Sequence, residues 1–304
     1  MEPTQYIWKD GELIDWDDAT VHVLSHGLHY GTGAFEGIRA YETDRGPAVF
    51  RLTEHMERLT RSCRALSIPV EWNADELAKA AKELFAANGL RSGYIRPIVF
   101  YGTGSMGLDP SGVGVHTFIA CFGFGPYLGE EGVEHGITAT VSSWRRITHE
   151  ALMPNAKITG GYVNSVLAIQ EAVRGGYDEA IMLNADGFVA EGSGENLFVV
   201  RDGAVTTPPL ATGVLEGVTR STVMTLLEED GHPVDLHQVT RTDLYYADEI
   251  FLTGTAAEVT PVREVDDHPV GEGKPGRITR LAQERFMAAA TGRDERHADW
   301  LEHV

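Results

Sequence analysis

A short stretch rich in glycine and glutamate, GPYLGEEGVEHG at residues 125–136, separates two halves of this 304-residue chain. Each half has its own pattern of strand and helix signals, whereas the stretch itself has little hydrophobic periodicity and is typical of a loop. The chain is long enough to bury one large hydrophobic core or two smaller ones. The sequence therefore predicts a first domain at residues 1–124, an interdomain loop at 125–136 and a second domain at 137–304.

The first half combines strand and helix signals, as is typical of an α+β domain. Asp10-Gly11 lies between two short strand-like runs and predicts a β-hairpin. An apolar stripe predicts a helix, and Asn73 followed by Glu76 predicts a capping box at the start of a second helix. The helices are expected at about 53–66 and from 73 to an end at Asn88-Gly89, and the further strands at about 35–41, 48–52, 93–101 and 115–124.

The second half alternates between strands and helices up to residue 304. The strands are expected at about 137–142, 197–201, 234–239, 249–253 and 259–262, with a hairpin across 184–187. The helices are expected at about 162–174 and 218–230, with a last one from about 275.

Charge and composition exclude several classes of function. A formal net charge of −20 and a pI of about 4.9 argue against nucleic acids and anionic membranes as partners. The chain contains no apolar run of about 18 residues and no secretory signal pattern. Two distant cysteines, Cys63 and Cys121, match no metal-binding spacing and favour a reducing, cytoplasmic compartment.

The chain has only five lysines, so a reaction that needs a lysine has few candidates. Lys9, Lys79, Lys82 and Lys274 each fit a solvent-exposed turn or helix face. Lys157 differs, because it lies in MPNAKITGGY between a proline and two glycines, ahead of an expected helix. Partial burial there would lower the pKa of the amine and make it a nucleophile for a Schiff base. A lysine on a surface turn is the alternative.

Two further motifs in the second half carry polar groups suited to a cofactor. In FVAEGSGENLF, Glu191 could pair with a protonated ring nitrogen, and Ser193 and nearby backbone donors could bind an anion. A bulged hairpin with exposed acids is the alternative. LEGVTR at 215–220 opens a helix with backbone N–H groups that could bind a phosphate, and Thr255 in GTAAE could add a hydroxyl. LEGVTR is also compatible with an ordinary N-terminal helix cap, and Thr255 alone is a weak signal.

Two motifs in the first half could line a substrate pocket. Tyr94 and Arg96 are two residues apart on an expected strand, so their side chains share one face. They could shape a pocket or form a simple cation–π pair. HGLHYGTGAFEGIRAY places glycines among aromatic residues ahead of a strand, which indicates a binding rim or a bent strand start.

Other chemistries find less support. GTGSMG at 102–107 follows an expected strand but leads to LDPSG and not into a helix, as a dinucleotide-binding G-x-G-x-x-G motif would, and no Walker-type phosphate loop occurs. His22, His26 and His29 are interpreted as a pocket rim or as buried, hydrogen-bonded histidines rather than as ligands of a metal.

Taken together, YGTGAFEGIRAY, YIRPIVFYG, AEGSGENLF, LEGVTR and GTAAEVTPV resemble the branched-chain aminotransferases of the fold-type-IV pyridoxal-phosphate enzymes. The resemblance covers nearly the whole chain. It implies an α+β fold with a smaller N-terminal α/β domain and a larger C-terminal domain with a β-barrel-like core, and a site at the domain interface. It also implies pyridoxal 5′-phosphate as cofactor and a homodimer, or a hexamer, as the assembly.

The resemblance also assigns residues. Lys157 resembles the lysine that holds the cofactor, Glu191 the partner of the ring nitrogen, and Tyr162 the donor to the 3-oxygen of the ring. The phosphate site would comprise Arg58, Val218, Thr219 and Thr255, with Leu215 packed on the ring. The substrate pocket would comprise Tyr30 (reaching the neighbouring subunit), Phe35, Tyr94, Arg96, Tyr127, Thr255 and Ala256.

The activity implied is a ping-pong transfer of the amino group of leucine, isoleucine or valine to 2-oxoglutarate. Phe124 and Glu216 stand where the family often has tryptophan and proline, and KITGGY changes the residues between Lys157 and Tyr162. These departures leave substrate breadth open. The alternatives are a D-amino-acid or (R)-amine aminotransferase, an aminodeoxychorismate lyase, or a non-catalytic small-molecule-binding protein.

Overall fold

The computed structural model describes residues 2–125 and 128–304, which form two compact units. Unit 1 comprises Met1–Gly125, Ala156–Gly161 and Ala289–Val304, and unit 2 comprises Pro126–Asn155 and Tyr162–Ala288. The chain thus returns to unit 1 twice, at residues that the sequence analysis assigned to the second domain. Backbone pairing explains both returns: Ile158 bridges to Ala34, and residues 301–303 pair with residues 48–50.

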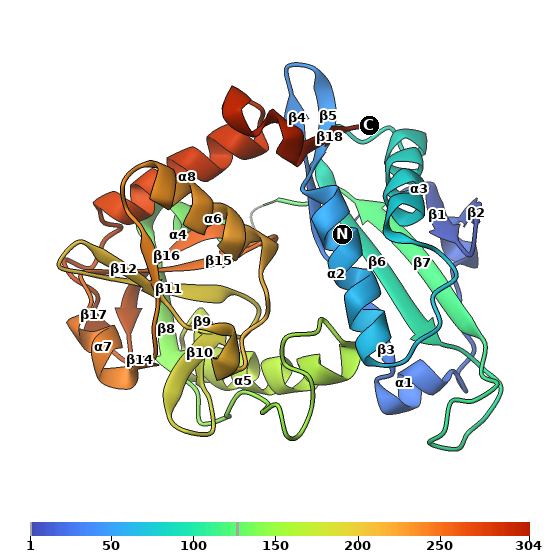
Figure 1. The fold of residues 1–304 in the computed structure, drawn as a ribbon, viewed down its shortest axis with the longest axis horizontal. Coiled ribbons are helices and arrows are strands. Elements are labelled where there is room, and N and C mark those ends of the chain that lie inside the picture. The colour runs from blue at the N-terminus through green and yellow to red at the C-terminus, as the bar shows by residue number, and fades with distance from the viewer. Residues whose placement is uncertain (1, 126–127) are drawn as a thin grey trace. The chain divides into compact units, whose positions relative to one another are not determined.

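Unit 1 is built on an antiparallel sheet of the order β18-β5-β4-β6-β7-β1-β2, with β3 paired to β6 (Figure 1). The turn between β1 and β2 confirms the hairpin at Asp10-Gly11, where both residues have positive φ. The strands are β1 (Tyr6–Lys9), β2 (Glu12–Asp15), β3 (Gly33–Phe35), β4 (Ile38–Thr43), β5 (Gly46–Phe50), β6 (Gly93–Tyr101), β7 (Val115–Phe122) and β18 (Leu301–His303).

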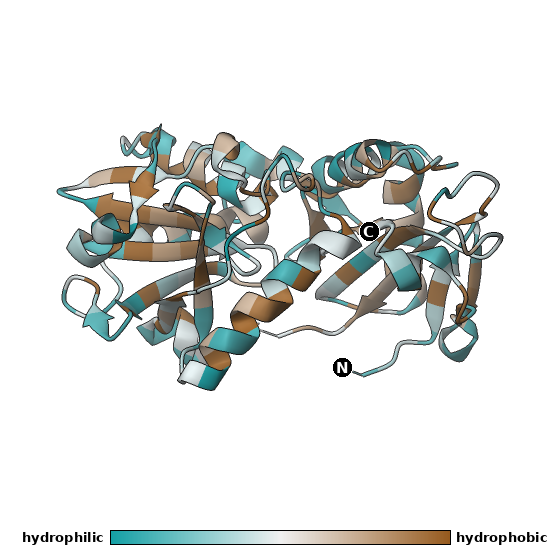
Figure 2. Cartoon of the chain, turned by 90° about the horizontal axis from the view of Figure 1, so that it is seen from below, coloured by the Kyte–Doolittle hydropathy of each residue, from teal (hydrophilic) through white to brown (hydrophobic). Residues whose placement is uncertain are grey.

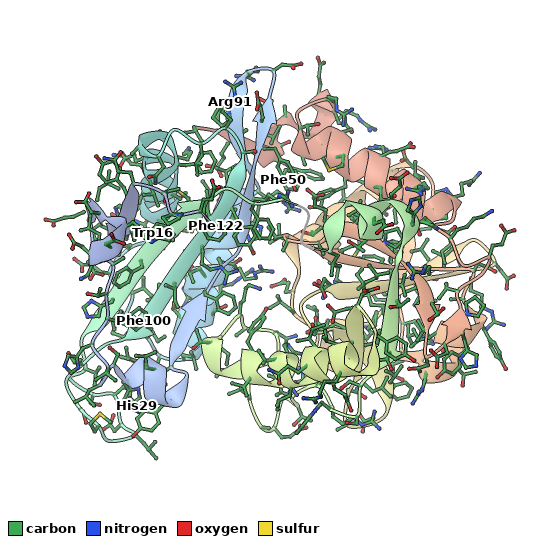
Figure 3. All side chains as sticks on the ribbon, turned by 180° about the vertical axis from the view of Figure 1, so that it is seen from behind. Trp16, His29, Phe50, Arg91, Phe100 and Phe122 are labelled. Carbon is green, nitrogen blue, oxygen red and sulfur yellow. The ribbon has the colours of Figure 1, made fainter. Side chains whose placement is uncertain are left out.

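Two helices of unit 1, α2 (Leu52–Ala65) and α3 (Ala74–Ala87), pack together over this sheet (Figure 1). Their apolar faces join strand residues in one core that includes Met56, Leu59, Phe85 and Ile95. Asn73 and Glu76 form the predicted capping box of α3. The short helix α1 (His26–Tyr30) precedes β3. The aromatic residues Phe100 and Phe122, which Figure 3 labels, come from β6 and β7.

Unit 2 contains a mixed sheet of the order β13-β12-β11-β15-β16-β8-β9-β10-β14, with β17 paired to β16. It corresponds to the barrel-like core expected of the second half. The parallel pairs are β12–β13, β16–β8 and β8–β9. The strands are β8 (Ile137–Val141), β9 (Glu179–Leu183), β10 (Phe188–Gly192), β11 (Asn196–Arg201), β12 (Ala204–Thr207), β13 (Val234–Leu236), β14 (Val239–Thr240), β15 (Glu249–Gly254), β16 (Glu258–Val265) and β17 (His268–Pro269).

The remaining helices pack against this sheet, with α5 near β9 and α6 near β15 (Figure 1). In Figure 2, the long helix in front is banded in hydrophilic and hydrophobic colours, as expected of an element with one buried face. The helices are α4 (Gly129–His135), α5 (Tyr162–Gly175), α6 (Val218–Glu229), α7 (Arg241–Tyr246) and α8 (Arg277–Ala290). Short 3-10 helices occur at η1 (Trp16–Asp18), η2 (Thr159–Gly161), η3 (Leu210–Thr212) and η4 (Glu295–Trp300).

One prediction about local structure is wrong. Most of the stretch expected to be a loop, residues 125–136, forms helix α4, which ends at Gly136 with φ +87°. The helix is only seven residues long, too short to show an apolar repeat. Its stabilisation comes from tertiary contacts, since Arg280 and Gln283 donate to the carbonyls of Glu134 and Val133.

Candidate active site

Lys157 lies in the segment 156–161, which packs against β3 of unit 1. Its backbone N–H donates to the hydroxyl of Ser62 on α2 at 3.0 Å, and its carbonyl accepts from the N–H of Phe35 at 3.1 Å. The side chain is half-buried, with Nζ 5.0 Å from the centre of the Phe35 ring. Since both backbone groups are held, the origin of the side chain is fixed and so is the region that the amine can reach.

The residues after Lys157 explain how the segment 156–161 comes so close to Gly31. A Cβ on Gly31 (φ +65°) would lie 2.6 Å from the Cα of Gly160, so only glycine fits. The carbonyl of Gly31 accepts from Thr159 Oγ1 at 2.7 Å and from the N–H of Gly160 at 3.0 Å. The Thr-Gly-Gly sequence thus fits this packing.

Arg58 on α2 is held by a buried carboxylate that the sequence analysis missed. Glu36 is fully buried and accepts from Arg58 Nε at 2.6 Å and Arg58 Nη2 at 2.9 Å. His55, one turn earlier on α2, approaches the same carboxylate with Nδ1 at 2.8 Å. The only signal in the sequence was an acidic residue amid FEGIRAY, where apolar neighbours predict burial but not the partner.

Charge decides the protonation of this cluster. Burial alone would raise the pKa of Glu36, but the charges of Arg58 and His55 and their hydrogen bonds hold that pKa well below its usual range. Burial lowers the pKa of His55, which opposes the effect of Glu36. We conclude that an ionised Glu36 balances Arg58, and that His55 donates a further hydrogen bond to the same carboxylate.

Aromatic and guanidinium groups gather on one face of the sheet in unit 1, as the alternation on β6 predicted. Arg96 lies 5.2 Å from the ring of Phe35 and 5.3 Å from that of Tyr94. Tyr94 also packs on Phe124, with ring centres 4.8 Å apart. A Cβ on Gly37 would lie 1.8 Å from the Tyr94 hydroxyl, so glycine at this position makes room for the tyrosine.

Tyr30 lies in an exposed part of unit 1. It is 39% exposed and its hydroxyl donates to the carbonyl of Met106 at 2.8 Å. Several exposed apolar side chains lie in the same two segments, residues 21–30 and 106–108. We call this set the apolar rim; it comprises Val21, Val23, Leu24, Leu28, Tyr30, Met106 and Leu108. Tyr127, the remaining aromatic residue predicted for the pocket, lies outside the described residues.

Glu191 is the centre of a buried polar network in unit 2. One carboxylate oxygen lies 2.9 Å from Arg146 Nε. The other accepts from Asn196 Nδ2 at 3.0 Å and from the backbone N–H of Leu215 at 2.9 Å. Since Glu191 is only 5% exposed, these donors offset the cost of burying its charge. The alternative of a hairpin with exposed acids is therefore wrong for Glu191.

The start of α6 lies next to this network. Gly217 is the N-cap residue, and no side chain caps the helix. A Cβ on Gly217 would lie 1.9 Å from Asn196 Oδ1, so glycine permits the contact between helix start and β11. Val218 and Thr219 are the first residues of α6 and both are buried. Backbone N–H groups at an uncapped helix start are suited to bind an anion.

A strand end supplies further hydroxyls in unit 2. Thr255 and Ala256 are half-buried in the turn between β15 and β16. Thr253 on β15 pairs in register with Asn196 and is 1% exposed. Among the described residues, its Oγ1 is one of two buried side-chain polar atoms without a hydrogen-bond partner. An unsatisfied buried hydroxyl is uncommon and indicates a missing polar partner. Tyr162, half-buried, begins α5.

Ser193 does not behave as predicted. Its N–H donates to the buried carboxylate of Glu179 at 3.2 Å, so this donor is engaged by the protein itself rather than by an external anion. Glu195 lies beside Glu179, and burial, together with the negative charge of Glu179, raises the pKa of Glu195 well above its usual value. The sequence did not predict this acidic pair.

The remaining polar clusters are structural. The ring of His26 is hydrogen-bonded through both nitrogens, to Thr32 and to the carbonyl of Gly107. No group of three metal-ligating side chains comes together in the part of the chain that the structure describes.

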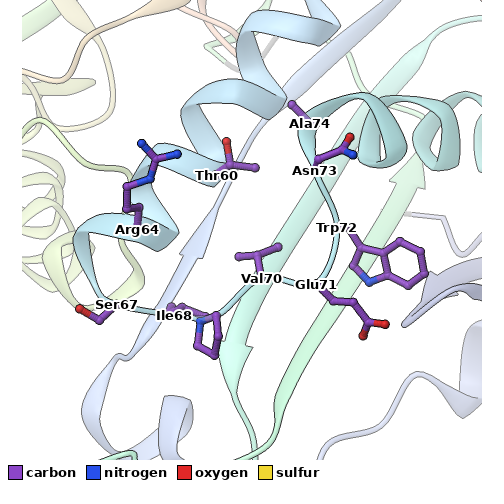
Figure 4. A pocket seen from close by; sticks show the side chains of 10 residues that line it. Thr60, Arg64, Ser67, Ile68, Val70, Glu71, Trp72, Asn73 and Ala74 are labelled. Carbon is purple, nitrogen blue, oxygen red and sulfur yellow. The ribbon is translucent and has the colours of Figure 1, made fainter.

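A groove of about 630 Å³ in the α2–α3 connection is lined by residues such as Arg64 and Trp72 (Figure 4). None of the predicted site residues lines this groove.

The structure thus brings the predicted residues together within each unit. Unit 1 holds Lys157 with Phe35, Tyr94 and Arg96 on one side and Arg58 on α2. Unit 2 holds Glu191 with Leu215 and the start of α6. The supporting residues Glu36, His55, Ser62, Arg146 and Asn196 were not predicted. All but Asn196, which lies five residues after Glu191, act through contacts between segments 19 or more residues apart in the sequence.

Comparisons with known proteins agree with this arrangement. Residues 33–265 match the family described as amino-transferase class IV. A branched-chain-amino-acid aminotransferase of Pseudomonas aeruginosa is 48% identical over 294 residues, which are 97% of this chain and 95% of that protein. The Escherichia coli branched-chain amino acid aminotransferase structure is 46% identical, with a TM-score of 0.97 and 99% of each chain covered.

A second similar structure carries a ligand. It is the T.th. branched-chain amino acid aminotransferase complexed with N-(5′-phosphopyridoxyl)-L-glutamate, 42% identical, with a TM-score of 0.92, covering 99% of this chain and 98% of that one. The chain described here belongs to the class IV aminotransferases, in the family of the branched-chain-amino-acid aminotransferases.

Members of this class use pyridoxal 5′-phosphate, and the residues present fit that group. A half-buried amine, a buried carboxylate and an uncapped helix start match its aldehyde, its ring nitrogen and its phosphate. The orphaned hydroxyl of Thr253, opposite Asn196, is a further sign that unit 2 presents polar groups to a ligand.

Proposed function

We propose that this chain transfers the amino group of leucine, isoleucine or valine to 2-oxoglutarate. The observation that carries the proposal is the 48% identity to a branched-chain-amino-acid aminotransferase over nearly the whole of both chains. The lysine, the buried carboxylate and the aromatic pocket residues support the same reaction.

Each group of the cofactor would have its own partners in the chain. Lys157 would bind its aldehyde carbon, and Glu191 the ring nitrogen. Tyr162 would donate to the 3-oxygen, and Leu215 would pack on the ring. The phosphate would be bound by Arg58, the first N–H groups of α6 at Val218 and Thr219, and the Thr255 hydroxyl. Bound in this way, the cofactor supplies an electron sink for the pair left behind when a substrate loses its α-proton.

Lys157 and the residues around Glu191 would then have separate roles in the reaction. The Lys157 amine, once released by the incoming amino acid, would carry the α-proton as a general acid–base. Arg146, Asn196 and the Leu215 N–H fix the Glu191 carboxylate, so that it would accept a hydrogen bond from a protonated ring nitrogen in one orientation. This fixed geometry lowers the reorganisation needed during the reaction.

One pocket must accept both an aliphatic side chain and a carboxylate. Phe35, Tyr94 and Ala256 would supply apolar surface, and Tyr127 would complete it. The Arg96 guanidinium, set against two aromatic rings, would attract the carboxylate of 2-oxoglutarate or of glutamate. The phosphopyridoxyl-glutamate complex of the related T.th. enzyme supports a glutamate-type substrate.

The apolar rim of unit 1 supports a homodimer as the smallest active assembly. Its side chains include Val23, 70% exposed, Leu28, 63%, and Leu108, 79%. Apolar side chains this exposed on two adjoining segments are typical of an interface. Tyr30 belongs to this rim and would reach the neighbouring subunit. A hexamer would be built from such dimers.

We also propose a cytoplasmic location. Both cysteines are buried and unbridged, which fits a reducing compartment. The described part of the chain contains no helix long and apolar enough to cross a membrane.

An absorbance experiment tests the proposal. The purified protein, loaded with pyridoxal 5′-phosphate, should show a visible band that added L-leucine abolishes and 2-oxoglutarate restores. Lys157→Ala should not form this band. A band that responds to D-amino acids or to simple (R)-amines but not to L-leucine would place the substrate in another branch of the class. A protein that forms no band under any loading condition would contradict the proposal altogether.

A further inference from the structure

Helix α2 presents three buried polar side chains on one face, at His55, Arg58 and Ser62. Their spacing of three and four residues places them on one side of a helix. His55 is 2% exposed, Arg58 5% and Ser62 2%. A row of polar groups in an otherwise apolar core is costly unless each group has a partner. The partners of these three side chains therefore indicate what the polar row does.

The row faces two segments that are far apart in the sequence. His55 and Arg58 contact Glu36, which follows β3 directly. Ser62, one turn after Arg58, accepts from the backbone N–H of Lys157 at 3.0 Å. The two segments are joined as well, because the N–H of Phe35 donates to the carbonyl of Lys157.

We propose that Ser62 is a positioning residue for Lys157, setting the direction in which the amine leaves the backbone. The hydroxyl holds one backbone group of the lysine, and Phe35 holds the other. Arg58, one turn before Ser62, is thereby fixed relative to the same lysine by a single rigid helix. Nothing in the proposed reaction requires Ser62 to touch the substrate or the cofactor.

The chemistry of the contact explains why a serine suits this position. A buried N–H without an acceptor is unfavourable, and the chain would shift to find one if the hydroxyl were removed. A shift at the backbone of Lys157 is transmitted to Nζ at the far end of a four-carbon side chain. Displacements of about 1 Å at a reacting group can lower a rate by roughly a hundredfold.

This inference rests on the proposed function, in which Lys157 binds the cofactor. The test uses the full-length protein with Ser62→Ala, Ser62→Thr and the matched control Cys63→Ala. Cys63 is the adjacent residue on α2 and is fully buried, and its replacement also removes one heavy atom. The control reports what a small cavity in α2 does without any contact to Lys157.

The first readout is the pH titration of the visible band of the lysine-bound cofactor, measured without substrate. We expect Ser62→Ala to shift its midpoint by about 0.5 pH unit or more, and Cys63→Ala to leave it unchanged. The second readout separates kcat from KM: Ser62→Ala should lower kcat roughly tenfold with little change in KM. Ser62→Thr, which keeps the hydroxyl, should restore both values toward those of the wild type.

The outcomes of these measurements either support or overturn the inference about Ser62. A titration midpoint that moves equally in Ser62→Ala and Cys63→Ala would mean that Ser62 only fills space, and would overturn the inference. The same holds if Ser62→Ala forms the band and titrates as the wild type does. If Ser62→Thr does not fold, the comparison of the two alanine variants still decides. A wild-type protein without any band would instead refute the proposed function.

Discussion

The ion pair between Glu36 and Arg58 offers the sharpest test of how unit 1 is stabilised. Replacing Glu36 by glutamine removes the charge but keeps the size of the side chain. Arg58, 5% exposed, would then be a buried cation without its carboxylate. Breaking a buried pair in this way costs about 3–5 kcal/mol of unfolding free energy.

Urea unfolding followed by tryptophan fluorescence would measure this loss. Four of the five tryptophans, Trp8, Trp16, Trp72 and Trp300, lie in unit 1, so their fluorescence reports on the unit that holds Glu36. The matched control is Glu42→Gln, which removes the same charge from the exposed pair with Arg91 and should leave the midpoint unchanged.

The pH dependence supplies a second, independent check. Burial raises the pKa of Glu36, yet Arg58 and His55 together bring it well below the ordinary value of 4.5. A carboxyl group with a lowered pKa in the folded state stabilises the protein above its unfolded pKa and loses that contribution as the pH falls. The gap in stability between wild type and Glu36→Gln should therefore be largest at neutral pH and narrow below about pH 4.5.

Two results would refute this reasoning. One is a destabilisation by Glu36→Gln of less than about 1 kcal/mol, the range of exposed pairs. The other is a gap that stays constant from neutral to acidic pH. The double variant Glu36→Leu with Arg58→Met should recover part of the lost stability, because it leaves no unpaired charge.

Three further predictions concern the pocket, the cofactor and the assembly. Gly37→Ala should displace Tyr94 and lower kcat/KM for L-leucine by about tenfold or more, and an unchanged kcat/KM would argue against Tyr94 in the pocket. Gly217→Ala should push Asn196 away from its contacts and weaken cofactor binding by roughly 10–100-fold, as measured by fluorescence titration of the apoprotein; an unaltered Kd would exclude the contact. Leu108→Glu should dissociate the proposed dimer in sedimentation velocity, whereas an assembly that keeps its mass would mean that the interface lies elsewhere.

Local patterns predicted most elements of the fold because the residues that define them are close in sequence. The Asp10-Gly11 turn and the capping box of Asn73 and Glu76 are confirmed for that reason. Helix α4 was missed because it is short and depends on contacts from Arg280 and Gln283. Strand β18 was missed because only pairing with β5 makes those three residues a strand.

The candidate site shows the same difference between features that nearby residues define and features that depend on distant contacts. Lys157 and Glu191 could be singled out because unusual glycine-rich neighbours surround each of them. Their supports could not, since Ser62 precedes Lys157 by 95 residues and Arg146 precedes Glu191 by 45. A buried serine on a helix looks like any other small core residue until its partner is known. The roles proposed for the site residues remain predictions that the experiments above address.

The return of the chain to unit 1 has a consequence for how the protein is made. During synthesis, β5 and the helix that follows it emerge long before β18, and Thr53 hydrogen-bonds Glu302 across 249 residues. Until residues 301–303 arrive, the outer edge of β5 is an unpaired strand edge, which is prone to join other chains. A fragment that stops at residue 125 would keep that open edge and would also lack Lys157. Unit 1 therefore needs residues from three separate segments of the chain, and no single contiguous fragment of its N-terminal part contains all of it.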